Sequence, residues 1–213
     1  MGSDPNLLIA VKSLNGAAKT KRKYDAVLTI EDPLFRNGLR FHSRPHPDHL
    51  VLMFEDVDVL RDDIAMPAME HIAAAIEFGR ENNSGSLLVH CKAGVARSTA
   101  LALAIIADRL GKGREQEAVR YLLKIRDCAV PNLVVLDMVD GYLGREGKLK
   151  QAWMSVENSS SKYAQHRMLK SKMLANHPSL FKEPFYCLSY SAWRFRPHTL
   201  VREGVIAPNT PRP

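Results

Sequence analysis

One nine-residue segment, 90-HCKAGVARS-98, constrains the fold of this chain more than any other. It follows the short apolar run 86-SLLVH-90 and leads into 97-RSTALALAIIADRLG-111, which is apolar and rich in Ala and Leu. A strand that enters a tight loop and leaves it as a helix gathers backbone N–H groups and a helix N-terminus at one point. Gly94 supplies the backbone freedom that such a loop demands. The segment therefore predicts an anion site built into an α/β fold.

The side chains of this segment point to phosphate chemistry. Arg97 follows Cys91 by six residues, and on a closed loop this spacing puts the guanidinium across from the sulfur. A guanidinium can bind two phosphate oxygens at once, and its positive field favours a reactive thiolate. Ser98 can donate its hydroxyl to the sulfur when a thiophosphate bond breaks. The backbone of the intervening residues is expected to bind phosphate together with Arg97: Lys92, Ala93, Gly94, Val95 and Ala96.

The pattern His-Cys-x5-Arg-Ser resembles the active-site signature of the cysteine-dependent protein tyrosine and dual-specificity phosphatases. A looser similarity to small bacterial members of this superfamily includes 53-MFEDV-57 and 131-PNLVVLDMVDGYLGREG-147. The resemblance implies a two-step reaction that uses no metal and no other cofactor. Cys91 attacks phosphorus to form a phosphocysteine, and an aspartic acid protonates the leaving oxygen and then activates water. His90 is implied as a supporting residue that orients Cys91 through hydrogen bonds.

The general acid is expected to be a carboxyl group on a movable loop about 30–40 residues before Cys91, at the end of the apolar run 50–57 or just after it. The acid of the family follows a strand that ends in Phe-x-Asp, and Phe54-Glu55-Asp56 fits this pattern. We therefore prefer Asp56, with Asp58 as the next choice. The candidates considered are Glu55, Asp56, Asp58, Asp62 and Asp63.

Three other groups of residues admit more than one interpretation. His42, His46 and His49 could suit a metal, but the two prolines between them favour a polar loop. Cys128 could form a protective disulfide with Cys91, although a buried apolar role is favoured. Asp137 matches an acid in a late helix of the family, and we expect it to be structural.

Strands and helices are predicted to alternate in the first part of the chain and to give way to helices only. This order predicts an α/β fold with a mainly parallel central sheet flanked by helices in three layers. Pro67 is expected in the first turn of the first of these helices. The expected strands are 7–12, 26–30, 50–57 and 84–91, and the expected helices are 66–82, 97–111, 114–127 and 133–144.

Charge divides the chain into two parts. The net charge is +7, and residues 151–213 contribute +6 of it through nine Lys or Arg against three Glu. We therefore expect a phosphatase domain at 1–150 and a basic, aromatic-rich extension at 151–213, formed by a helix and an extended arm. Packing of this extension on the body or on a second copy of the chain is favoured over binding to nucleic acid or to an anionic surface.

Several further expectations concern partners and compartment. No apolar run approaches the roughly 20 residues that cross a bilayer, and the N-terminus lacks the pattern of a secretory signal. Three cysteines, an odd number, indicate reduced thiols and a cytoplasmic location.

The expected partner is a phosphorylated protein or another phosphomonoester. The opening HCKAG also occurs in phosphoinositide phosphatases, but Val95 stands where those enzymes carry a second Lys. The remaining alternatives are an RNA 5′-phosphatase, suggested by the basic extension, and a phosphate-binding module without turnover.

Overall fold

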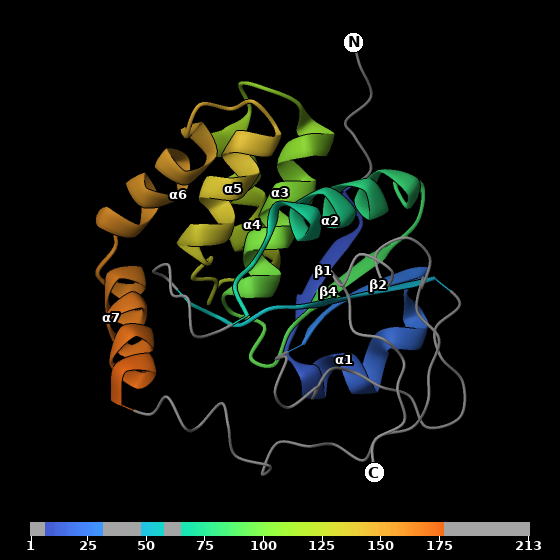
Figure 1. Ribbon diagram of the computed structural model, residues 1–213, viewed down its shortest axis with the longest axis horizontal. Helices are drawn as coiled ribbons and strands as arrows, with labels where there is room; N and C mark the ends of the chain where they lie inside the picture. The colour runs from blue at the N-terminus through green and yellow to red at the C-terminus, as the bar shows by residue number, and fades with distance from the viewer. Residues whose placement is uncertain (1–6, 32–47, 58–64, 177–213) are drawn as a thin grey trace.

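A four-stranded parallel sheet forms the centre of the molecule (Figure 1). The structure, a computed structural model, describes residues 7–31, 48–57 and 65–176. The strands are β1 (Ile9–Lys12), β2 (Ala26–Glu31), β3 (His49–Met53) and β4 (Leu87–His90), in the order β1-β4-β2-β3. The predicted parallel α/β fold is confirmed. Strand β3 is shorter than the expected run 50–57, because the chain leaves the sheet after Met53.

Helices cover both faces of this sheet. Helix α1 lies on one side together with a short 3-10 helix, Lys21–Lys23, whereas α2, α3 and α4 contact the sheet from the opposite side (Figure 1). Sequence analysis did not anticipate α1, although Ser13 is a typical N-cap residue and its hydroxyl accepts the N–H of Gly16 at 3.3 Å. The helices are α1 (Leu14–Thr20), α2 (Met69–Glu81), α3 (Arg97–Leu110), α4 (Glu115–Ile125), α5 (Leu133–Tyr142), α6 (Lys148–Asn158) and α7 (Ser161–Asn176).

Helix α3 carries the phosphate-type loop at its N-terminus and is the most deeply buried helix. Nearly all of its residues are buried, because the sheet packs on one side and α2, α4 and α5 pack on the others. This explains why its sequence is apolar on every side. Gly111 ends the helix at φ 89°, as expected.

The expected position of Pro67 is wrong. Ala68 is extended, with φ −123° and ψ 162°, so helix α2 begins only at Met69 and Pro67 precedes the N-cap. The ring nitrogen Nδ1 of His71 accepts the N–H of Ala68 at 2.9 Å and takes the place of the Glu or Gln at the third position of a capping box.

The expected division at residues 150 and 151 falls inside helix α6. Leu149 and Trp153 on this helix are both fully buried in the core, so one continuous element crosses the division. Helix α7 follows and packs against α6, where a helix was expected in the extension. The extended arm lies outside the described residues. No helix in the described part of the chain is long and apolar enough to span a bilayer.

Candidate active site

The loop between β4 and α3 surrounds the sulfur of Cys91. The Cys91 Sγ lies 3.1 Å from the Ser98 hydroxyl oxygen and accepts the N–H of Gly94 at 3.3 Å. Gly94 has φ 68°, and a Cβ there would come within 2.4 Å of the Lys12 carbonyl oxygen. Only glycine fits this turn, because a side chain would meet both backbone strain and a backbone clash.

Every carbonyl group of residues 92–96 accepts a hydrogen bond from outside the loop. A trans peptide unit points its N–H opposite to its C=O, so the N–H groups of residues 93–97 are directed toward the loop interior. Such a ring of N–H groups at a helix N-terminus is an anion site. The donors, in loop order, are Leu14 N (3.0 Å), Arg126 Nη2 (3.3 Å), Arg126 Nε (2.8 Å), Val130 N (2.8 Å) and Asn132 N (3.3 Å).

The Arg97 side chain is buried and connects the loop to the segment that precedes Asp56. Its Nη1 donates to the Phe54 carbonyl oxygen at 2.7 Å. Arg126, which holds two loop carbonyls, was not anticipated from the sequence. Nothing in its local pattern distinguishes it from a surface arginine at the end of α4.

A buried chain of hydrogen bonds lies behind Cys91. The Thr29 hydroxyl oxygen is 2.8 Å from Nε2 of His90 and 2.7 Å from Nε2 of His49. The Nδ1 of His90 lies 3.4 Å from the Cys91 carbonyl oxygen, which can only accept. His90 therefore carries its proton on Nδ1, its Nε2 accepts from Thr29, and Thr29 accepts in turn from His49.

His90 is neutral at physiological pH. Its burial lowers its pKa to about 4, and the charge of Lys21 lowers it as well, whereas the hydrogen bond to the Cys91 backbone acts in the opposite direction. A neutral imidazole with a fixed tautomer can orient the Cys91 backbone, and it is unsuited to proton transfer near pH 7.

The Asp56 carboxyl lies beside Arg97 and is held by two residues that come from distant elements. Its Oδ1 accepts Asn132 Nδ2 at 2.9 Å and Lys170 Nζ at 2.9 Å. Burial acts to raise the pKa of Asp56. The charges of Lys170 and Arg97, with hydrogen bonds from Lys170 and Asn132, outweigh this and hold the pKa below its ordinary value.

Neither partner of Asp56 was expected from the sequence. Asn132 could have been found as the N-cap of α5, since its Oδ1 accepts the N–H of Val135 at 3.0 Å. No sequence pattern distinguishes Lys170, because it is one of several basic residues on α7. Among the other candidate acids, Glu55 donates its N–H to the Ala65 carbonyl oxygen at 2.8 Å, and Asp58, Asp62 and Asp63 lie outside the described residues.

The remaining histidine, cysteine and aspartate candidates that the structure describes lie apart from one another. His49 lies on β3 in the buried hydrogen-bond chain, and His42 and His46 lie outside the described residues. Within residues 7–31, 48–57 and 65–176, no group of three or more His, Cys, Asp or Glu is arranged to bind a metal. Cys91 and Cys128 are both free thiols. Asp137 accepts Lys150 Nζ at 2.6 Å on the surface.

Comparisons with known proteins agree with this arrangement. No family model matches the chain. Dual specificity protein phosphatase 22-A of Danio rerio is 27% identical over 158 residues, 71% of this chain and 73% of that protein. Dual specificity protein phosphatase 15 of Mus musculus is 30% identical over 111 residues, which are 47% of this chain and 45% of that protein. This chain thus matches less than half the length of the second relative.

A solved structure shares the fold. The human tyrosine phosphatase-like serine/threonine/tyrosine-interacting protein superimposes with a TM-score of 0.50 at 21% identity, covering 63% of this chain and 89% of that one. At this identity the likeness concerns the arrangement of sheet and helices.

Proposed function

We propose that this chain is a cysteine-dependent phosphatase of the protein tyrosine and dual-specificity superfamily, and that it hydrolyses phosphomonoesters through a phosphocysteine intermediate. One observation carries the proposal: the peptide units of residues 92–96 all turn their carbonyl groups outward around the Cys91 sulfur. This arrangement offers a phosphate its backbone donors at the same place as a nucleophile.

In the first step, the Cys91 sulfur attacks phosphorus and forms a phosphorus–sulfur bond while the bond to the leaving oxygen breaks. The loop N–H groups and the Arg97 guanidinium bind the equatorial oxygens, where charge develops. Asp56 gives its proton to the leaving oxygen. In the second step, Asp56 takes a proton from water, the water oxygen attacks phosphorus, and the sulfur departs. The Ser98 hydroxyl, 3.1 Å from the sulfur, stabilises the departing thiolate.

We propose phosphorylated proteins as the substrates, with activity on phosphotyrosine and on phosphoserine or phosphothreonine. The two curated relatives are named as dual-specificity protein phosphatases, which favours this class. A reduced compartment such as the cytoplasm would keep the Cys91 thiol free. Parallel assays on phosphopeptides, phosphoinositides and RNA 5′-ends distinguish this proposal from the phosphoinositide and RNA alternatives.

A second candidate is a phosphate-binding module with little turnover. The contact between Asp56 and Lys170 favours it, because an aspartate held as an anion is a poor proton donor. Hydrolysis of an aryl phosphate by the purified chain decides between the two candidates.

The covalent mechanism predicts the behaviour of Cys91→Ser. Turnover of an aryl phosphate should be lost, whereas tungstate should still bind, because the loop backbone and Arg97 remain. Cys128→Ser is the matched control, since it changes another free thiol, which is half-buried and has no role in the proposed reaction. Isothermal calorimetry and a steady-state assay measure the two properties. Turnover by Cys91→Ser at the parent rate would refute the phosphocysteine mechanism.

A further inference from the structure

Helix α7 brings a lysine to the candidate general acid. The Nζ of Lys170 lies 2.9 Å from Oδ1 of Asp56, and the two side chains are only 10% and 17% exposed. Solvent therefore screens this ion pair much less than an ordinary surface pair. A residue of the C-terminal part of the chain thus contacts a group that the proposed reaction uses.

The position of Lys170 is fixed by the packing of α7. Arg167, three residues earlier on the same helical face, donates to both carboxyl oxygens of Glu157 on α6 at 2.9 and 2.8 Å. Arg167 also donates to the Pro131 carbonyl oxygen at 3.0 Å. The Tyr163 ring contacts the Trp153 ring at a centroid distance of 5.7 Å. These contacts anchor α7 against α6 and against the residue that precedes Asn132.

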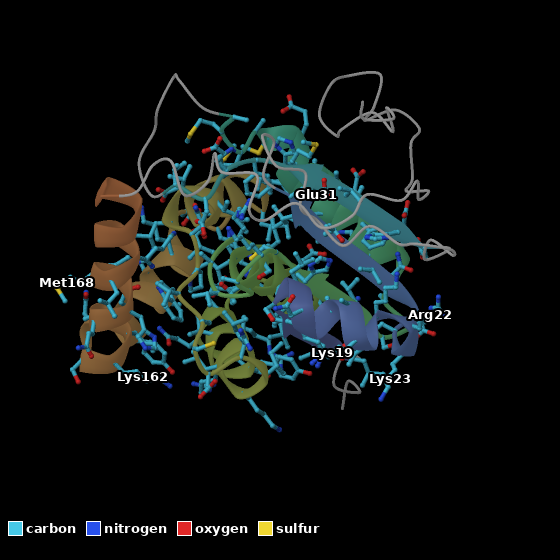
Figure 2. All side chains as sticks on the ribbon, turned by 90° about the horizontal axis from the view of Figure 1, so that it is seen from below. Lys19, Arg22, Lys23, Glu31, Lys162 and Met168 are labelled. Atoms are coloured by element: carbon cyan, nitrogen blue, oxygen red, sulfur yellow. The ribbon has the colours of Figure 1, made fainter. Side chains whose placement is uncertain are left out.

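The opposite side of α7 has a different character. Met168 is 47% exposed and points away from the body, as Figure 2 shows. Lys162 is also largely exposed, and its Nζ donates to the Asp127 carbonyl oxygen at 2.9 Å. Helix α7 therefore carries one lysine that contacts Asp56 and another, Lys162, that contacts Asp127.

Among the described residues, three elements supply the charged and polar groups that face Asp56. They are Lys170 from α7, Arg97 from α3 and Asn132 at the start of α5. Two of the three are cations, and both stabilise the anionic carboxylate. Lys170 thus opposes the protonated form of Asp56 that the first reaction step requires, while it leaves the anionic form ready to accept a proton from water in the second step.

We propose that Lys170 is a positioning residue of the active site, which holds the Asp56 carboxylate beside Arg97 and sets the pH range in which Asp56 acts as a general acid. The inference rests on the proposed function and assigns a role in catalysis to helix α7. Its consequence is that release of Lys170 from Asp56 makes protonation of Asp56 easier and extends activity to higher pH.

The test compares the full chain with Lys170→Met and Lys170→Arg over a range of pH. The leaving groups are phenol, which needs a proton, and 4-nitrophenol, which needs it much less. For Lys170→Met the basic limb of the kcat profile on phenyl phosphate should move to higher pH. At pH values where the parent rate already falls, the rate of Lys170→Met, as a fraction of its own plateau, should be about tenfold higher than that of the parent, because one close opposite charge is lost. Lys170→Arg should keep the parent profile. Lys162→Met removes the same charge from the same helix and should leave the limb in place.

Two results would overturn the inference. One is an unchanged limb in Lys170→Met whose circular dichroism and Tm match the parent. The other is an equal shift in Lys162→Met, which would indicate an effect of total charge. If Lys170→Met fails to fold, Lys170→Gln compared with Lys170→Arg gives the same decision, because the pair differs mainly in charge.

A carboxyl titration separates this inference from the proposed function. Carbon NMR follows the Asp56 carboxyl in the parent and in Lys170→Met, and Asp56→Asn identifies the signal. A titration that moves to higher pH in Lys170→Met supports the contact even if the parent hydrolyses nothing, a result that would refute the proposed function alone. An unmoved titration in an active enzyme would overturn the role of Lys170 alone.

Discussion

The side chain of Arg97 contacts the Phe54 backbone and also acts on the Asp56 carboxyl. It is buried, its Nη1 donates to the Phe54 carbonyl oxygen, and its charge helps to lower the pKa of the Asp56 carboxyl. A planar group with five N–H donors can serve a carbonyl and a phosphate together. The arginine therefore connects the loop 91–96 to the segment that bears Asp56.

Arg97→Lys should lower kcat/KM on an aryl phosphate roughly a hundredfold, which corresponds to about 3 kcal/mol of transition-state stabilisation. Lysine keeps the charge but cannot contact Phe54 and two phosphate oxygens in the same geometry. Steady-state kinetics measure the effect. Arg80→Lys is the control, because Arg80 pairs with Asp108 on the surface. A rate for Arg97→Lys within about threefold of the parent would argue against Arg97 as the phosphate ligand.

Asp56→Asn should reduce the rate mainly for poor leaving groups. A phenol of low pKa departs without a proton, whereas a tyrosine or serine oxygen needs one. The loss should shrink along a series of aryl phosphates as the leaving group becomes more acidic, and the basic limb of the pH profile should flatten. Glu55→Gln is the matched control on the adjacent residue. If Asp58→Asn shows this dependence and Asp56→Asn does not, the acid is assigned two residues too early.

For single residues, the sequence predicts site residues that lie close together in the chain better than site residues that folding brings together from distant elements. Cys91, Gly94, Arg97 and Ser98 were recognisable because one short loop must contain all of them in a fixed order. Lys170 reaches Asp56 only through the packing of α7 on α6, and no spacing in the sequence records that packing.

Three strands are joined behind Cys91 by the hydrogen bonds of Thr29. This residue lies on β2 and contacts His90 on β4 and His49 on β3, its two neighbouring strands. All three side chains are fully buried, so each lost hydrogen bond leaves a polar atom that water does not reach. The same chain of bonds fixes the tautomer of His90 next to Cys91.

Thr29→Val should therefore cost about 1–3 kcal/mol in the free energy of unfolding, because valine has the same shape but no hydroxyl. Urea denaturation measures the loss, and Thr29→Ser should recover most of it. Thr20→Val is the control: its hydroxyl donates only locally to the half-buried Gly16 carbonyl oxygen at 2.8 Å. An equal loss of stability in Thr20→Val would show that the buried hydrogen bonds of Thr29 contribute no more than one local hydrogen bond.

The strands and long helices were predictable because their apolar runs are long or regular. Helix α1 was missed because seven residues with two buried side chains give little periodic signal. The start of α2 was misplaced because Pro67 suits a first helical turn and also the extended residues before one. Both errors come from local sequence that fits more than one backbone conformation.

For the whole molecule, charge and packing divide the chain differently. Composition changes near residue 150, where the basic excess begins. Packing continues through α6, because the Trp153 indole is fully buried and donates to Glu157 Oε2 at 2.6 Å. Charge depends on surface residues, whereas the extent of the core depends on a few large apolar side chains, so a compositional boundary need not coincide with the end of the packed body.

Two truncated chains test where the packed body ends. A chain that ends at residue 160 keeps α6 and should unfold cooperatively, although it loses the contacts of α7 with α6. A chain that ends at residue 147 loses the buried side chains of Leu149 and Trp153. At about 1.5–3 kcal/mol for each, this removes roughly 3–6 kcal/mol from a total stability on the order of 5–15 kcal/mol.

We expect chain 1–160 to be folded and chain 1–147 to be unfolded or to have a much lower midpoint of urea denaturation. Far-UV circular dichroism measures both, because its signal does not depend on the tryptophan that the shorter chain lacks. The shorter deletion also removes Lys170, so chain 1–160 should show the same shift of the basic limb as Lys170→Met. Equal stability of 1–147 and 1–160 would mean that α6 is dispensable and that the body ends where the composition changes. A folded chain 1–160 with the parent pH profile would instead contradict the role of α7 at Asp56, while the boundary after α6 would stand.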